Sequence, residues 1–176
     1  MIFEEKTLES RRIYEGKIIN LREDKVTTKN GTSFREVVEH NGGAVMAAIT
    51  DEGKMVMVRQ YRKPAERVML EVPAGKIDPG EDPKMTAARE LKEETGYTAG
   101  KIEYITFFYP SVGYSEEKLY LYLCTELTPG ETDPDESEAI DIEEMDIDEL
   151  CRMVMEGHIN DAKTIAAVLI ARELTR

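Results

Sequence analysis

The chain has 176 residues, a formal net charge of −13, and a composition of 41% hydrophobic and 34% charged residues. This length suits one domain with a substantial core, and the composition is that of a globular protein. The acidic balance argues against nucleic acid as a partner, because phosphate backbones are bound by basic surfaces. No run of 18 apolar residues occurs, so no membrane span is expected. The start "MIFEEKTLESRR" lacks the apolar core of a signal peptide, and we expect a cytoplasmic protein.

The first forty residues are expected to form short strands. Segments 17–28 and 33–40 flank a turn at 29–32 that contains Asn30-Gly31, a pair typical of hairpin turns. An isolated hairpin is marginally stable, so this part must pack on another surface. We therefore expect a small antiparallel β segment over residues 1–41 that mediates dimerisation, followed by a separate domain over residues 42–176.

The remaining chain mixes strand and helix patterns. A second hairpin is expected from residues 44–50 and 55–61 around the turn "DEGK", and further strands at 68–75, 101–110, 117–127 and 139–147. Amphipathic helices are expected at 146–157 and 161–176. The mixed order predicts an α/β sandwich around one mixed sheet.

A short helix is expected between Asp82, a good N-cap followed by Pro83, and Gly96, a good C-cap. Its second half carries three glutamates, and 3.6 residues per turn place them within about 100° of one helix face.

The crowding of Glu90, Glu93 and Glu94 has an electrostatic cost. Like charges three or four residues apart repel, and carboxylates near a helix C-terminus oppose the macrodipole. Arg89 can offset part of this repulsion by pairing with Glu93 one turn later. A solvated acidic face and a site for a hard cation such as Mg²⁺ both fit the crowding alone.

The spacing distinguishes between these two interpretations. The chain reads Gly, five residues, Glu, seven residues, then Arg-Glu-Leu-Lys-Glu-Glu-Thr-Gly-Tyr. This pattern resembles the complete signature of the Nudix hydrolases, and a chance match has a probability of about 10⁻⁸ per start position at ordinary residue frequencies. The one departure is Tyr97, where the family prefers an aliphatic residue. The matched positions are Gly75, Glu81, Arg89, Glu90, Glu93, Glu94 and Gly96.

The resemblance implies an α/β/α sandwich with a mixed sheet that uses divalent metal, Mg²⁺ with Mn²⁺ as a substitute, to hydrolyse a nucleoside diphosphate linked to another moiety. The segments "VRQYRKPAE", "LEVPAGKIDPGE" and "INDAKTIAAVLIARE" are similar to the ADP-ribose pyrophosphatase branch. This similarity implies hydrolysis of ADP-ribose to AMP and ribose 5-phosphate by a homodimer with exchanged N-terminal strands. Where that branch usually has a proline, this chain has Val112, and Pro110 stands two residues earlier.

Other functions remain open at this point. Hydrolases of GDP-mannose, NADH or other dinucleotides share the same signature, and Nudix-like nucleotide sensors bind without cleaving. The intact signature argues against a sensor. A calcium-binding module is not supported, because no EF-hand loop pattern occurs.

The resemblance also implies residue roles. Residues 128–138, "TPGETDPDESE", are a loop by composition, and a merely solvated acidic loop is the alternative for Glu136 and Glu138. Arg35 is expected to reach the substrate of the partner subunit, and the alternative for Arg62 is a surface charge at a strand end. The expected metal ligands are the carbonyl of Ala74 and the carboxylates of Glu90, Glu94 and Glu138; the catalytic group is Glu136 as general base with Glu93 and Arg89; the substrate-binding residues are Arg35, Arg62 and Gly75.

Overall fold

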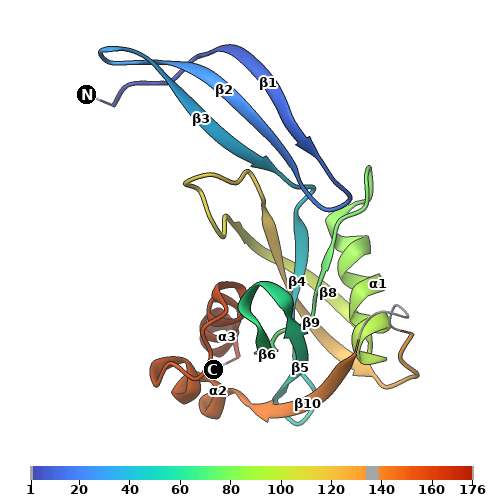
Figure 1. The fold of residues 1–176 in the computed structure, drawn as a ribbon. Helices are drawn as coiled ribbons and strands as arrows, with labels where there is room; N and C mark the ends of the chain where they lie inside the picture. Colours follow the sequence, from blue (N-terminus) through green and yellow to red (C-terminus); the bar gives the residue numbers. More distant parts are fainter. Residues whose placement is uncertain (1, 134–138, 176) are drawn as a thin grey trace. The chain divides into compact units, whose positions relative to one another are not determined.

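The computed structural model describes residues 2–133 and 139–175 and divides into two compact units (Figure 1). The smaller unit comprises Met1–Gly42 and Tyr109–Lys118, and the larger comprises Gly43–Phe108 and Leu119–Arg176. The predicted domain division into residues 1–41 and 42–176 stays a prediction.

The smaller unit is a three-stranded antiparallel sheet in the order β1-β2-β3. Its strands are β1 (Thr7–Glu15), β2 (Asn20–Thr28) and β3 (Gly31–Glu39). The expected hairpin is confirmed, because Thr28 pairs with Gly31 across the turn. Segment 109–118 lies along β3, where the N–H of Val38 donates to the C=O of Tyr114 at 2.7 Å.

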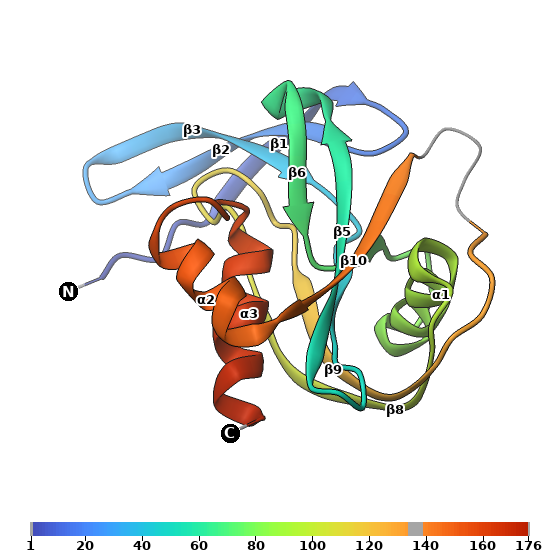
Figure 2. The same ribbon diagram turned by 90° about the horizontal axis from the view of Figure 1, so that it is seen from below.

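The larger unit contains two sheets rather than the single sheet expected. One is mixed, in the order β7-β4-β9-β8, and the other is antiparallel, in the order β10-β5-β6. Helix α1 lies on one side of these strands and helices α2 and α3 lie on the other (Figures 1 and 2). The predicted α/β sandwich is therefore confirmed. Its elements are β4 (Gly43–Ala48), β5 (Lys54–Arg62), η1 (Lys63–Ala65), β6 (Arg67–Glu71), β7 (Ala74–Lys76), α1 (Pro83–Thr95), β8 (Thr98–Phe108), β9 (Leu119–Thr128), β10 (Ile140–Asp146), α2 (Ile147–Met155) and α3 (Ala162–Leu174).

Strand β4 is buried on both faces. Successive side chains of a strand point to opposite sides, so Val45 and Ala47 pack into one core with residues of α2 and α3. Ala44, Met46 and Ala48 face the other side and share a second core with α1. The run of six buried residues thus reflects a strand covered by helices on both sides.

The predicted second hairpin, formed by residues 44–50 and 55–61, is wrong except at its turn. Ile49 and Met55 form an isolated bridge next to the turn, but the two strands then enter different sheets. Strand β4 pairs with β7 and β9, whereas β5 pairs with β6 and β10. Both strands are apolar on two faces, and separating them lets each lie inside a sheet. Within the described ranges, no helix has the length and apolar character needed to cross a membrane.

Candidate active site

Helix α1 begins and ends at the predicted caps. Asp82 Oδ1 accepts the backbone N–H of Lys84 at 2.8 Å, and Pro83 occupies the first helical position. At the other end, Gly96 adopts a φ of 74° and donates its N–H to the C=O of Lys92 at 2.8 Å. These caps fix which residues of the helix face the sheets.

The three glutamates do not form a solvated acidic face. Glu94 is only 6% exposed and lies on the same buried face of α1 as Leu91. The side chain of Glu90 is 16% exposed, and that of Glu93 is 37% exposed. Removing carboxylates from water is costly unless they are paired, hydrogen-bonded or bound to a metal.

Arg89 pairs with three carboxylates at once. Its Nη1 lies 2.9 Å from Glu90 Oε1 and 2.9 Å from Glu93 Oε2, which confirms the predicted pair one turn apart. The sequence did not reveal the third contact, in which Arg89 Nη2 lies 3.0 Å from Glu81 Oε2. Hydrogen bonds from Arg89, and then from Thr86, lower the pKa of Glu81 to about 2. One arginine therefore orients the glutamates and lessens their mutual repulsion.

Glu90 and Glu94 both lie against the backbone of Ala74 and Gly75. The N–H of Ala74 donates to Glu94 Oε2 at 3.1 Å. A Cβ atom placed on Gly75 would lie 1.8 Å from Glu90 Cδ, so only glycine leaves room for this carboxylate. Strand β7, which carries both backbone positions, is held by antiparallel pairing with β4.

The chemistry of these donors fits a hard divalent cation. The side chains that lie against β7 are the carboxylates of Glu90 and Glu94, and carboxylate oxygens are ligands that Mg²⁺, Mn²⁺ and Ca²⁺ prefer. Over residues 2–133 and 139–175, no three acidic, histidine or cysteine side chains are already grouped as ligands of one ion. Glu90 and Glu94 lie together against β7, where they would hold the ion, and the ligand role of the Ala74 carbonyl stays a prediction.

The acidic segment after β9 starts beside the C-terminal end of α1. The N–H of Asp133 donates to the C=O of Glu93 at 3.1 Å. A Cβ atom on Gly96 would meet the carbonyl oxygen of Gly130 at 2.5 Å, so the two backbones approach closely. The predicted base Glu136 and ligand Glu138 lie outside the described residues, and their roles stay predictions.

The two predicted substrate-binding arginines occupy different units. Arg62 ends β5, where it is paired with the buried carboxylate of Glu71, a residue that the sequence pattern did not single out. Arg35 lies on β3 of the smaller unit, and its Nε donates to Glu5 Oε2 at 2.9 Å. Contact with a partner's substrate stays a prediction for Arg35.

Three aromatic side chains that could stack on a nucleobase are exposed in the single chain. Tyr14, Phe34 and Tyr61 are 55%, 60% and 57% exposed. None of the three belongs to a hydrophobic core.

Comparison with known families decides the identity of this fold and site. The model of the Nudix domain matches residues 40–168. The chain belongs to the Nudix family. The model of the nucleoside diphosphate sugar hydrolase N-terminal domain matches residues 5–38. Nudix hydrolases generally need a divalent metal, which agrees with the oxygen donors beside β7.

Several relatives resemble this Nudix protein over nearly its whole length. An ADP-ribose pyrophosphatase of Bacillus subtilis is 44% identical and covers 94% of this chain and 91% of its own. A methanol dehydrogenase activator of Bacillus methanolicus is also 44% identical, with coverages of 95% and 92%. An ADP-ribose pyrophosphatase of Mycobacterium tuberculosis is 37% identical, with coverages of 96% and 84%. The crystal structure of an ADP compounds hydrolase shares the fold, with a TM-score of 0.86, 21% identity and coverages of 99% and 95%.

The closeness of Gly75 to Glu90 makes a testable prediction. In Gly75→Ala, the new methyl group displaces the Glu90 carboxylate, and we expect Mn²⁺ affinity to fall at least about 10-fold, as when a metal site loses its geometry. Calorimetric titration of the substrate-free protein with Mn²⁺ measures this change.

Gly80→Ala, in the turn between β7 and α1, is the matched control. A Cβ atom there meets nothing within 4 Å, although the φ of +82° adds backbone strain. This variant should lose some thermal stability and keep its Mn²⁺ affinity. Equal Mn²⁺ affinities in wild type and Gly75→Ala would show that Glu90 is not a metal ligand.

Proposed function

We propose that this protein hydrolyses ADP-ribose to AMP and ribose 5-phosphate, with Mg²⁺ as its metal and Mn²⁺ as a substitute. The observation that carries the proposal is the complete Nudix signature, folded so that Glu90 and Glu94 lie against Ala74–Gly75. Two relatives named ADP-ribose pyrophosphatase, aligned over at least 94% of this chain, support the choice of substrate. A cytoplasmic location stays a prediction.

Each site residue has a separate role in the proposed hydrolysis. Divalent metal held by Glu90, Glu94 and the Ala74 carbonyl would neutralise the phosphate oxygens and orient the attacking water. Arg62 donates to a phosphate oxygen, and Arg89 keeps Glu93 in place beside Glu90. Water attacks one phosphorus atom, and the bond between that phosphorus and the bridging oxygen breaks. The bridging oxygen leaves with the other phosphate group, and Glu136 takes the proton of the water.

A substrate panel tests the proposed function. ADP-ribose, GDP-mannose, NADH and a diadenosine polyphosphate are incubated with Mg²⁺, and phosphate is measured after coupling to a phosphatase. We expect ADP-ribose to give the highest kcat/KM. Glu94→Gln serves as the inactive control, because it removes one ligand charge while its amide oxygen can still accept the Ala74 N–H. A preference for GDP-mannose or NADH would transfer the proposal to that substrate, and no turnover of any compound would favour a nucleotide sensor.

The roles of the two acidic-loop residues predict different kinetics. Glu136→Gln should lower kcat by roughly 10²–10⁴-fold with little change in KM, which is the usual contribution of a general base. Glu138→Gln should instead raise the Mg²⁺ concentration needed for half-maximal rate. Rate measured against Mg²⁺ for both variants separates these roles. A near-normal kcat for Glu136→Gln at saturating Mg²⁺ would assign the base elsewhere, with Glu93 or Glu116 as the next candidate.

A homodimer with exchanged N-terminal strands completes the proposal. Strand β1 is exposed along its whole length, and Leu8, Ile13 and Tyr14 are each about half exposed. Apolar surface of this kind favours association with a second copy. Light scattering at micromolar concentration should give twice the 20.0 kDa mass of the chain. A stable monomer would contradict both the dimer and the reach of Arg35 into a partner's site.

A further inference from the structure

A carboxylate lies almost completely buried at the end of β6, outside the Nudix signature. Glu71 is 1% exposed and lies three residues before Ala74. Burying an ionised carboxylate requires partners that replace its lost hydration. Glu71 has two cationic partners, Arg62 from the neighbouring strand β5 and Lys163 from the distant helix α3.

The pairing of Glu71 with Arg62 is bidentate, with one hydrogen bond to each carboxylate oxygen. Arg62 Nε donates to Glu71 Oε1 at 2.8 Å, and Nη2 donates to Glu71 Oε2 at 2.7 Å. This geometry fixes the plane of the guanidinium and leaves Nη1 as a donor that Glu71 does not use. The Arg62 side chain is 39% exposed, so the guanidinium reaches from a buried anchor toward the surface.

Lys163 holds Glu71 from the other side. Its Nζ contacts Glu71 Oε2 and lies 2.9 Å from Asp161 Oδ2. Burial has the largest influence on Glu71 and raises its pKa, but Arg62 and Lys163 together outweigh burial and lower the pKa below its ordinary value. Glu71 is therefore ionised at neutral pH and binds both cations.

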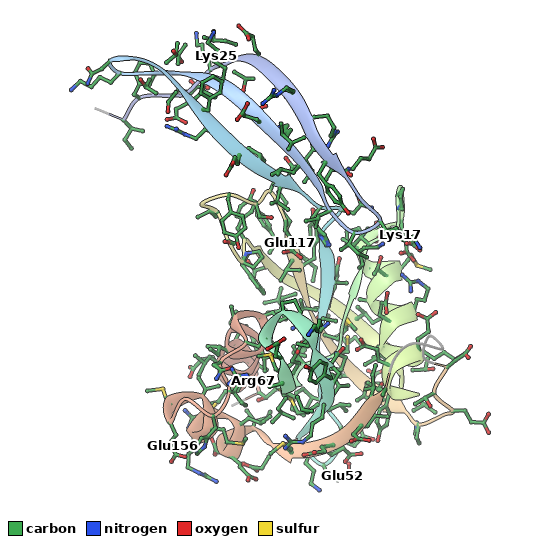
Figure 3. All side chains as sticks on the ribbon, viewed as in Figure 1. Lys17, Lys25, Glu52, Arg67, Glu117 and Glu156 are labelled. Atoms are coloured by element: carbon green, nitrogen blue, oxygen red, sulfur yellow. The ribbon has the colours of Figure 1, made fainter. Side chains whose placement is uncertain are left out.

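The start of α3 connects this carboxylate to the backbone that leads into the metal site. Asp161 caps α3 by accepting the N–H of Thr164 at 3.0 Å, and Thr164 Oγ1 accepts the N–H of Val72 at 3.1 Å. Arg67, labelled in Figure 3 beside α3, donates to Asn160 Oδ1 at 2.6 Å. The segment from Glu71 to Ala74 is thus bound at both ends. Lys163 and Thr164 of α3 contact Glu71 and Val72, and Glu94 accepts the N–H of Ala74.

The charge of Glu94, a candidate metal ligand, also affects the pKa of Arg62. The hydrogen bonds to Glu71 are the largest cause of its raised pKa, and the charges of Glu71, Glu94 and Asp161 raise the pKa further. Arg62 is therefore within electrostatic range of Glu94. A cation whose pKa is affected by the charge of a candidate metal ligand can also act on a phosphate group bound near that ligand.

We propose that Glu71, braced by Lys163, is a positioning residue that orients the Arg62 guanidinium toward the diphosphate of the substrate. This inference rests on the proposed function, because it takes Arg62 as the group that binds phosphate. Glu71 itself does not touch the substrate. Its ionised carboxylate restricts Arg62 to one orientation, so substrate binding does not have to order a long flexible side chain.

A double-mutant cycle between Glu71 and Arg62 tests the proposal. Glu71→Gln replaces one acceptor oxygen with an NH₂ group that faces the donors of Arg62. We expect this variant to raise KM by about 10-fold and to change kcat by less than about 3-fold, which is the scale of one charge-assisted hydrogen bond. In an Arg62→Ala background, Glu71→Gln should change KM by less than about 2-fold, since the group it positions is absent.

The same cycle is measured without turnover, from the dissociation constant of the substrate used in the kinetics for the metal-free protein. Kinetics use whichever compound of the panel the wild type cleaves, so failure on ADP-ribose contradicts the proposed function and not this inference. If Glu71→Gln does not fold, Lys163→Met replaces it in the cycle, with a KM increase of about 3-fold that also disappears in Arg62→Ala.

Glu143→Gln is the matched control, because Glu143 pairs with Arg59 on the same strand as Arg62. Its KM should stay within about 2-fold of wild type. A purely structural role for Glu71 would lower thermal stability and change KM equally in the wild-type and Arg62→Ala backgrounds. That result, or an unchanged KM in both Glu71→Gln and Lys163→Met, would overturn the proposal.

Discussion

The mutual repulsion of carboxylates on one helix is the constraint around which this structure is organised. Glu90, Glu93 and Glu94 occupy little more than one turn of α1, and each like-charge pair opposes the helix by a few tenths of a kcal/mol. One guanidinium reduces this repulsion, because Arg89 forms ion pairs with Glu90, Glu93 and also Glu81. That arrangement lowers the electrostatic cost of directing Glu90 and Glu94 toward β7.

The backbone beside the helix matters as much as the charges. Gly75 has no side chain, and Glu90 occupies the space that any Cβ atom would fill. The N–H of Ala74 meets Glu94 from the neighbouring position. Strand β7 therefore gives the carboxylates a main-chain N–H and the space to lie against it, and its pairing with β4 ties their position to the most buried strand of the larger unit.

A second set of charges surrounds the buried carboxylate of Glu71 at the end of β6. Arg62, Glu71, Lys163 and Asp161 alternate in sign, so the set is neutral, and α3 supplies half of it. Buried ion pairs add little to stability compared with apolar packing, but breaking one leaves an uncompensated charge. Such a set is therefore better suited to fixing the geometry of Arg62 than to stabilising the fold.

The sequence by itself determined the family, the limits of α1 and the identity of the site helix. Local chemistry explains this success, because Asp82, Pro83 and Gly96 act through their immediate neighbours, and the spacing of the signature needs no knowledge of distant contacts. The Arg89–Glu93 pair was predictable for the same reason, as both residues lie on one helix.

Only the tertiary structure decided which distant groups meet. The local pattern of β4 and β5 predicted a hairpin, yet both strands are apolar on two faces and separate into different sheets, a choice that depends on the strands and helices available to cover them. Glu71 and Lys163 are 92 residues apart, and nothing in the spacing of either residue indicates their contact. Such contacts follow from long-range packing, which short sequence patterns do not encode.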